Sequence, residues 1–70
     1  MVTARFENLD EDKQDEILNA AAEEFADKGY EGASINRIID AAGISKGSMY
    51  YYFEDKADLF ATTVKVATEH

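Results

Sequence analysis

Apolar residues recur three and four positions apart along this chain, and no other feature constrains its fold as strongly. Ile35, Ile38, Ile39 and Ala42, for example, occupy positions i, i+3, i+4 and i+7, which lie on one face of an α-helix. Proline is absent, and glycine occurs at only four positions. The spacing predicts an all-α domain with helices at about 10–28, 35–42, 46–52 and 56–69.

Residues that begin and end helices mark the borders of these segments. Asp10 and Ser34 carry the side-chain oxygens that cap helix N-termini, and we expect Ser45 to cap the short third helix. Gly29 is expected just past the end of the first helix, and Gly43 is expected to take the left-handed conformation of a tight turn. Two short helices joined by a turn that holds a glycine are typical of a helix-turn-helix.

The first and fourth helices differ in how much of their surface is apolar. In the first, the apolar side chains share one arc, with acidic residues opposite. In the fourth, which begins at Asp55 with Asp58 as a partial capping box, they cover about 160° and predict packing on two sides. These side chains are Ile17, Leu18, Ala21, Ala22 and Phe25 in the first helix, and Leu59, Phe60, Val64, Val66 and Ala67 in the fourth. Tyr30 is assigned to the core behind the helix pair.

Charge is distributed unevenly along the chain, whose net charge is −8. Ten acidic and three basic residues lie within residues 1–31, whereas Arg37 and Lys46 outnumber Asp40 within residues 32–53. Because phosphate repels an acidic surface, only the middle third suits nucleic acid. The acidic face of the first helix is interpreted as solvated surface.

Length and composition limit the remaining possibilities. Seventy residues form one domain at most, here residues 1–70, and a core of this size supplies ~3–5 kcal/mol of net stability. The chain has no cysteine for a disulfide or a thiolate metal site, which fits a reducing compartment. No apolar run approaches the ~20 residues that span a bilayer, and the acidic start does not resemble a signal peptide. We therefore expect a cytoplasmic domain without a membrane partner, metal or cofactor.

The segment SKGSMYYYFEDK, residues 45–56, places three consecutive tyrosines on one short helix. Met49 and Phe53 are four residues apart and form its core side. Tyr51 lies about 180° from that side, so the three tyrosines cannot all be buried. The outward face is predicted to consist of Gly47, Ser48 and Tyr51, flanked by Tyr50, Tyr52, Ser45 and Lys46.

This outward face suits the major groove of DNA. A helix fits a groove ~12 Å wide, glycine lets the backbone approach, and hydroxyls and rings reach base edges or a thymine methyl. The same tyrosines could instead cover a small core while their hydroxyls stay in water. The helix-turn-helix spacing favours the DNA interpretation.

The run GYEGASINRIIDAAGISKGSMYYYFEDKADLF, residues 29–60, closely resembles the DNA-binding domain of the TetR family of transcriptional regulators. The upstream segment ILNAAAEEFADKGY resembles the first helix of that family, so the resemblance covers about residues 9–64. One departure is Ile39, where alanine is common in the family.

The resemblance implies a homeodomain-like three-helix head that reads double-stranded DNA, with the fourth helix leading to a C-terminal domain absent from this chain. That domain would bind a small-molecule inducer and form a homodimer on an inverted-repeat operator, as in a ligand-responsive repressor. By analogy, Ser34, Arg37 and Lys56 would contact phosphate. The positions of the recognition helix are occupied by Ser45, Lys46, Gly47, Ser48, Tyr50, Tyr51 and Tyr52.

Several of these features allow other interpretations. Arg37 could form a surface ion pair with Asp40 or Glu31, worth ~0–1 kcal/mol. Catalysis is disfavoured because the only histidine is the terminal His70 and no paired catalytic carboxylates can be inferred. A helical protein-interaction module would use the apolar face of the fourth helix, and salt-sensitive binding of duplex DNA would discriminate against it.

Overall fold

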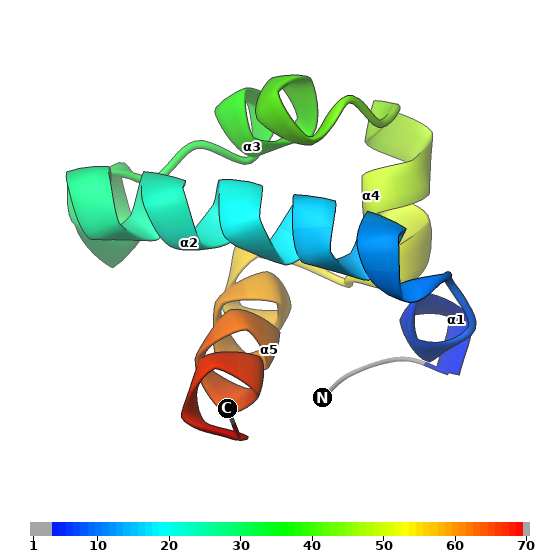
Figure 1. The fold of residues 1–70 in the computed structure, drawn as a ribbon. Helices are drawn as coiled ribbons and strands as arrows, with labels where there is room; N and C mark the ends of the chain where they lie inside the picture. The colour runs from blue at the N-terminus through cyan, green and yellow to red at the C-terminus, as the bar shows by residue number, and fades with distance from the viewer. Residues whose placement is uncertain (1–3, 70) are drawn as a thin grey trace.

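The computed structural model describes residues 4–69, which form helices and, within that range, no strand. The helices are α1 (Ala4–Glu7), α2 (Glu11–Gly32), α3 (Ile35–Ala42), α4 (Lys46–Tyr52) and α5 (Lys56–Glu69). Figure 1 shows α3 crossing one side of the long α2, α5 crossing the other side, and α4 standing beside the N-terminal part of α2. The predicted all-α fold is confirmed. Within the described range, none of the helices is both long and apolar enough to cross a membrane.

Local capping determines where three of the helices begin. The side chains of Asp10, Ser34 and Ser45 each accept a hydrogen bond from the backbone N–H three residues ahead, at 2.9, 3.2 and 3.0 Å. Each bond satisfies one of the N–H groups that a helix leaves unpaired at its start. These three predicted caps are confirmed.

Two glycines provide backbone conformations that other residues rarely adopt. Gly29 has φ 73° and ψ 173°, so the helical geometry of α2 breaks there before a last turn reaches Gly32. The first helix was predicted to end just before Gly29, and the structure has a kink within α2 at this residue. Gly43 has φ 69° and ψ 32°, and its N–H donates to the carbonyls of Ile39 and Asp40. This left-handed cap ends α3 and starts the turn to α4.

The core lies where α2, α3, α4 and α5 meet. Ile17, Ile38, Met49 and Leu59, one from each helix, have no exposed surface. Burying a side chain of this kind contributes about 1.5–3 kcal/mol. Ile39, the departure from the family pattern, is also buried. The predicted apolar faces of the first two helices are confirmed except for Ala22, which is exposed.

The apolar arc predicted for the fourth helix is not buried as one surface. Leu59 is fully buried and Val66 packs partly against the core, but Phe60, Val64 and Ala67 are exposed. Packing of this arc on two sides was therefore a wrong prediction for Val64 and Ala67, whereas the ring of Phe60 packs 4.9 Å from that of Phe25 on α2.

Two threonines take part of the buried face of α5 instead. The Oγ1 of Thr62 donates to the carbonyl of Asp58 at 2.9 Å, and that of Thr63 donates to Leu59 at 2.7 Å. Because each hydroxyl is satisfied within its own helix, its burial carries no unpaired polar group. Half of the predicted capping box forms at the start of α5, where Asp55 accepts from the N–H of Asp58 at 2.8 Å, while the Asp58 carboxylate accepts from the N–H of Glu54 at 3.0 Å.

Tyr30 is not in the core, contrary to prediction. Its side chain is 37% exposed and lies on the surface in a small aromatic group. Its ring stacks 6.1 Å from Phe25 and meets the edge of Phe60 at 5.2 Å. Only Phe25 of this group is buried, because it faces inward from α2.

The first helix of the structure, α1, was not predicted. Phe6 is only 2% exposed, and its ring lies 5.0 Å from Phe53 and 6.3 Å from Tyr52. Four residues are too few to hold a helix alone, so α1 depends on this packing against the end of α4.

Candidate nucleic-acid interface

The rotation of α4 about its axis is set by two buried residues on one side. Met49 has no exposed surface, and Phe53, directly after the helix, is 1% exposed. The N–H of Phe53 donates to the carbonyl of Met49 at 2.9 Å and closes the last turn. With this side in the core, the opposite side of α4 must face solvent.

Two of the three tyrosines occupy that outward side. Tyr50 is 47% exposed and Tyr51 is 55% exposed, although large aromatic residues usually bury more of their surface. Tyr52 is only half-exposed, because its ring contacts Phe6 and lies 5.4 Å from the Tyr51 ring. Tyr52 thus supports Tyr51 from the side, whereas Tyr50 and Tyr51 project outward.

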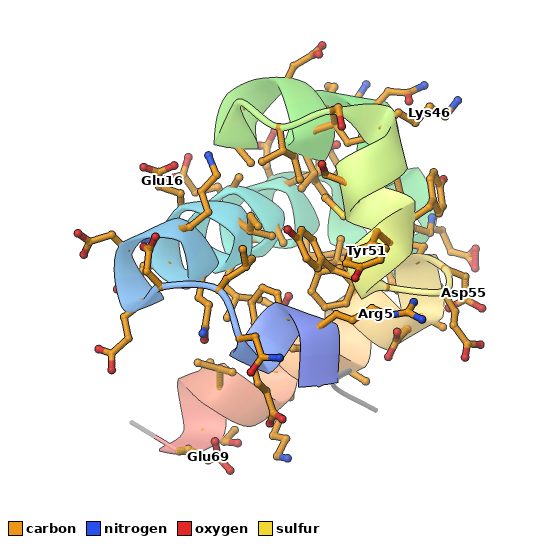
Figure 2. All side chains as sticks on the ribbon, turned by 90° about the vertical axis from the view of Figure 1, so that its right-hand side faces the viewer. Arg5, Glu16, Lys46, Tyr51, Asp55 and Glu69 are labelled. Carbon is orange, nitrogen blue, oxygen red and sulfur yellow. The ribbon has the colours of Figure 1, made fainter. Side chains whose placement is uncertain are left out.

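The start of α4 carries the small and basic members of the predicted face. The Ser45 hydroxyl caps the helix and also donates to the Ser48 hydroxyl at 2.9 Å, which leaves Ser48 partly buried. A Cβ added to Gly47 would meet only the Ser45 hydroxyl, at 3.9 Å, so this position opens toward solvent. Lys46 is exposed at the end of α4 farthest from Tyr51 (Figure 2).

A carboxylate joins Ser34 and Arg37 at the start of α3. Glu24 of α2 accepts from the Ser34 N–H at 2.9 Å and from Arg37 Nε at 2.8 Å, and its Oε2 forms an ion pair with Arg37 Nη2 at 2.8 Å. Arg37 also donates from Nη2 to the Gly32 carbonyl at 3.1 Å. The expected alternative partners of Arg37, Asp40 and Glu31, are not the ones it uses.

The surroundings of the Glu24 carboxyl favour its ionised form. Its side chain is only 12% exposed, whereas that of Arg37 is 54% exposed. The Ser34 N–H holds the pKa of Glu24 below its ordinary value; partial burial opposes this, and the Arg37 guanidinium and Lys28 reinforce it. Glu24 therefore stays ionised and fixes the position of Arg37.

Lys56, at the first residue of α5, points back to the connection between α2 and α3. Its ammonium donates to the carbonyls of Glu31 and Ala33, both at 3.3 Å, and lies 4.8 Å from the centre of the Tyr30 ring. Ser34, Arg37 and Lys56 therefore surround one short stretch of chain, residues 31–34. The residues predicted to contact DNA thus form two groups, one around this connection and one along α4.

Sequence reasoning missed two residues beside these groups, Glu24 and Arg5. Glu24 belonged to a series of acidic residues interpreted as solvated surface, and its pairing with a residue thirteen positions away gives no periodic signal. Arg5 belongs to α1 and reaches Tyr51. Among residues 4–69, no group of three or more histidine, cysteine or acidic side chains could hold a metal ion.

Comparison with known proteins gives a consistent result. A family model described as bacterial regulatory proteins, tetR family, matches residues 17–63. The repressor AcnR of Corynebacterium glutamicum is 47% identical over 45 residues, which are 64% of this chain and 24% of AcnR. The negative regulator IcaR of Staphylococcus aureus is 32% identical over 81% of this chain and 31% of IcaR.

Further relatives extend the similarity to an activator and to a solved structure. The transcriptional activator FasR of Mycolicibacterium smegmatis is 34% identical over 79% of this chain and 25% of its own length. A crystal structure of a TetR family transcriptional regulator from Chloroflexus aurantiacus superimposes with a TM-score of 0.87 at 42% identity, over 99% of this chain and 32% of that one. The chain therefore spans about a quarter to a third of these relatives. None of them supports a protein-interaction module, since each is named as a transcriptional regulator.

Proposed function

Because this chain belongs to the TetR family of bacterial transcriptional regulators, we propose that α4 lies in the major groove of double-stranded DNA and reads its sequence. The domain is the helix-turn-helix part of such a regulator, formed here by α3 and α4. The exposed side of α4 supports the proposal best. Met49 and Phe53 hold one side in the core, and Tyr50 and Tyr51 project from the opposite side, where a groove ~12 Å wide accepts a helix.

Within this proposal, α4 supplies the base contacts. Gly47 allows the backbone to approach the base pairs, and the hydroxyls of Ser48, Tyr50 and Tyr51 reach their edges. Ser45 and Lys46 lie at the start of the helix near the DNA backbone, and Tyr52 supports the Tyr51 ring.

Ser34, Arg37 and Lys56 position the domain on the DNA backbone. Arg37 uses Nε and Nη2 for Glu24 and Gly32, which leaves its Nη1 group for a phosphate. Lys56 holds its carbonyl partners at 3.3 Å, which are long bonds that a charged phosphate oxygen can replace. Such contacts give affinity and register but carry no sequence information.

The proposal also covers the full-length regulator that carries this domain. This regulator acts in the cytoplasm as a homodimer joined through a C-terminal domain, and two heads occupy the half-sites of an inverted-repeat operator about one helical turn apart. A small-molecule inducer binds the C-terminal domain and controls repression. We favour repression because AcnR and IcaR are named as a repressor and a negative regulator. A single DNA-binding domain cannot occupy two linked half-sites, so it binds DNA weakly.

The test separates sequence reading from positioning. The chain is used to select sequences from a random duplex pool, and binding of the selected and of scrambled duplexes is then measured for Ser48→Ala and Lys56→Ala. We expect Ser48→Ala to lower affinity for the selected duplex by ~1–3 kcal/mol and to change sequence preference. Lys56→Ala weakens binding to both duplexes by a similar factor.

Two results would reject the proposal. One is a chain that enriches no sequence and binds no duplex at low salt. The other is a Ser48→Ala variant that melts like the wild type and retains its sequence preference, together with the same result for Tyr51→Ala.

A further inference from the structure

Helix α1 lies outside the residues that match the family model, yet it packs directly against α4. The match covers residues 17–63, and α1 spans Ala4–Glu7. Phe6 anchors α1 by its contacts with Tyr52 and Phe53 at the C-terminal end of α4. The residue before Phe6 is therefore held close to the exposed side of α4.

That residue, Arg5, lies against Tyr51. Its guanidinium carbon is 4.6 Å from the centre of the Tyr51 ring, and its Nη1 donates a long hydrogen bond of 3.4 Å to the Tyr51 carbonyl. Arg5 is exposed, so neither contact removes its charge from solvent. Figure 2 shows the Arg5 side chain beneath the Tyr51 ring.

Arg5 keeps its positive charge available, whereas three of the seven basic residues of this acidic chain do not. Lys13, Lys28 and Arg37 are each paired with a carboxylate. Within residues 4–69, no carboxylate pairs with Arg5 or with Lys46. The charge of Arg5 is thus not cancelled by a neighbour, although the chain as a whole carries −8.

Arg5 and Lys46 lie at opposite ends of α4 (Figure 2). A helix of seven residues is about 10 Å long, so Arg5 and Lys46 are separated by roughly that length along the exposed side of α4. This separation is similar to the ~12 Å width of the major groove. The DNA strands that border the groove carry the phosphates. A helix lying in the groove would bring both cations toward them.

We propose that Arg5 is a further DNA-contact residue, whose guanidinium binds a backbone phosphate at the C-terminal end of α4 while it supports the Tyr51 ring. The DNA-binding surface then extends beyond the helix-turn-helix to α1. This inference rests on the proposed function of α4. Arginine suits the role because its planar group can stack on an aromatic ring and still donate to phosphate.

The experiment measures duplex binding by fluorescence anisotropy from about 50 mM to about 200 mM salt, the range in which phosphate contacts dominate the salt dependence. Wild type, Arg5→Gln and Arg5→Lys are compared on a duplex selected by the wild type and on a scrambled duplex. The matched control is Lys65→Gln on α5, which removes one positive charge from another exposed residue that forms no ion pair within residues 4–69. Thermal melting is followed for every variant.

We expect Arg5→Gln to reduce the salt slope by about 0.9, which corresponds to about eightfold weaker binding at 0.1 M salt for one lost phosphate contact. The loss should be similar on both duplexes, because a phosphate contact carries no sequence information. Arg5→Lys should retain the wild-type slope since it keeps the charge. Lys65→Gln should change affinity by less than about twofold, because Lys65 lies in the second half of α5 and is not among the residues proposed to contact DNA.

The inference is overturned if Arg5→Gln and Lys65→Gln bind alike. It is also overturned if Arg5→Lys loses as much affinity as Arg5→Gln and both melt at a lower temperature, because Arg5 would then only attach α1 to α4. Neither result affects the proposed function, which wild-type binding and its sequence preference decide separately. A wild-type chain that binds no duplex rejects both.

Discussion

Gly47→Leu should separate the stability of this domain from its function. Gly47 is the second residue of α4, has no positive φ, and a Cβ built on it meets only the Ser45 hydroxyl at 3.9 Å. Within the described part of the chain, nothing therefore obstructs a Cβ at this position. Leucine has a higher helix propensity than glycine. Because Gly47 is near a helix end, we use the lower end of the usual difference in helix propensity, so the variant should be about 0.5 kcal/mol more stable. For a domain of this size, that raises the melting temperature by about 2–4 °C.

The same substitution should remove DNA binding. The leucine side chain would project from the exposed side of α4 and hold the helix away from the base pairs. Each base contact contributes ~1–3 kcal/mol, so the loss of two such contacts weakens binding by at least about 30-fold. Gly47→Ala provides an intermediate, because its single methyl group adds little bulk.

Two measurements on the same samples decide the outcome. Circular dichroism during heating gives the melting temperature, and anisotropy with the selected duplex gives the affinity. If Gly47→Leu melts at or above the wild-type temperature and binds DNA equally well, α4 does not lie in the groove. The exposed tyrosines would then only cover the core.

Three further predictions concern the stability of the fold. Gly43→Ala should cost about 1–2 kcal/mol in urea denaturation, because alanine must adopt the left-handed conformation although no atom obstructs its Cβ; an unchanged midpoint would contradict this. Met49→Ala should cost about 2–5 kcal/mol, comparable to the whole stability of such a domain, so circular dichroism at 25 °C should show substantial unfolding, whereas full helicity would refute the anchoring role of Met49. Because its pKa is lowered in the folded state, ionised Glu24 contributes stability that is complete above its ordinary pKa of 4.5 and is lost as pH falls below that value. Melting temperatures between pH 6 and pH 3 should therefore fall less steeply for Glu24→Gln than for the wild type, and parallel curves would exclude this contribution.

Features encoded by neighbouring residues were predictable from the sequence. The caps at Asp10, Ser34 and Ser45 each form within four residues, and the conformation of Gly43 follows from its place after an apolar repeat. The inward direction of Met49 and Phe53 follows from helical spacing alone. For this reason, the three helices of the DNA-binding head and the exposed side of α4 were predictable from the sequence alone.

Features that depend on distant parts of the chain were not predictable. Helix α1 forms because Phe6 packs against Phe53, which is distant in the sequence. The four residues of α1 contain no helical repeat that would predict it. Thr62 was not among the apolar residues assigned to the fourth helix, yet its hydroxyl bonds within α5 and lets the residue be buried. Tyr30 appeared apolar enough for the core, but Phe25 already occupies the inner position beside it.

The role of the DNA-contact residues is a prediction. Their exposure and their grouping at α4 and at residues 31–34 agree with the proposed interface. The electrostatic environment of Arg37 could not be predicted, because its carboxylate partner is Glu24 on another helix and not an acidic residue of α3.

The local caps of α2, α3 and α4 also affect how the chain folds. Each cap joins residues only three positions apart, so selecting the start of each helix requires no contact between helices. Helical domains dominated by contacts of this kind fold on the order of microseconds to milliseconds. A head with little net stability opens often, but it also closes quickly. Because closing is fast relative to cleavage, a protease samples the equilibrium fraction of open chain, and its cleavage rate therefore reports the equilibrium stability of this domain and not its unfolding rate.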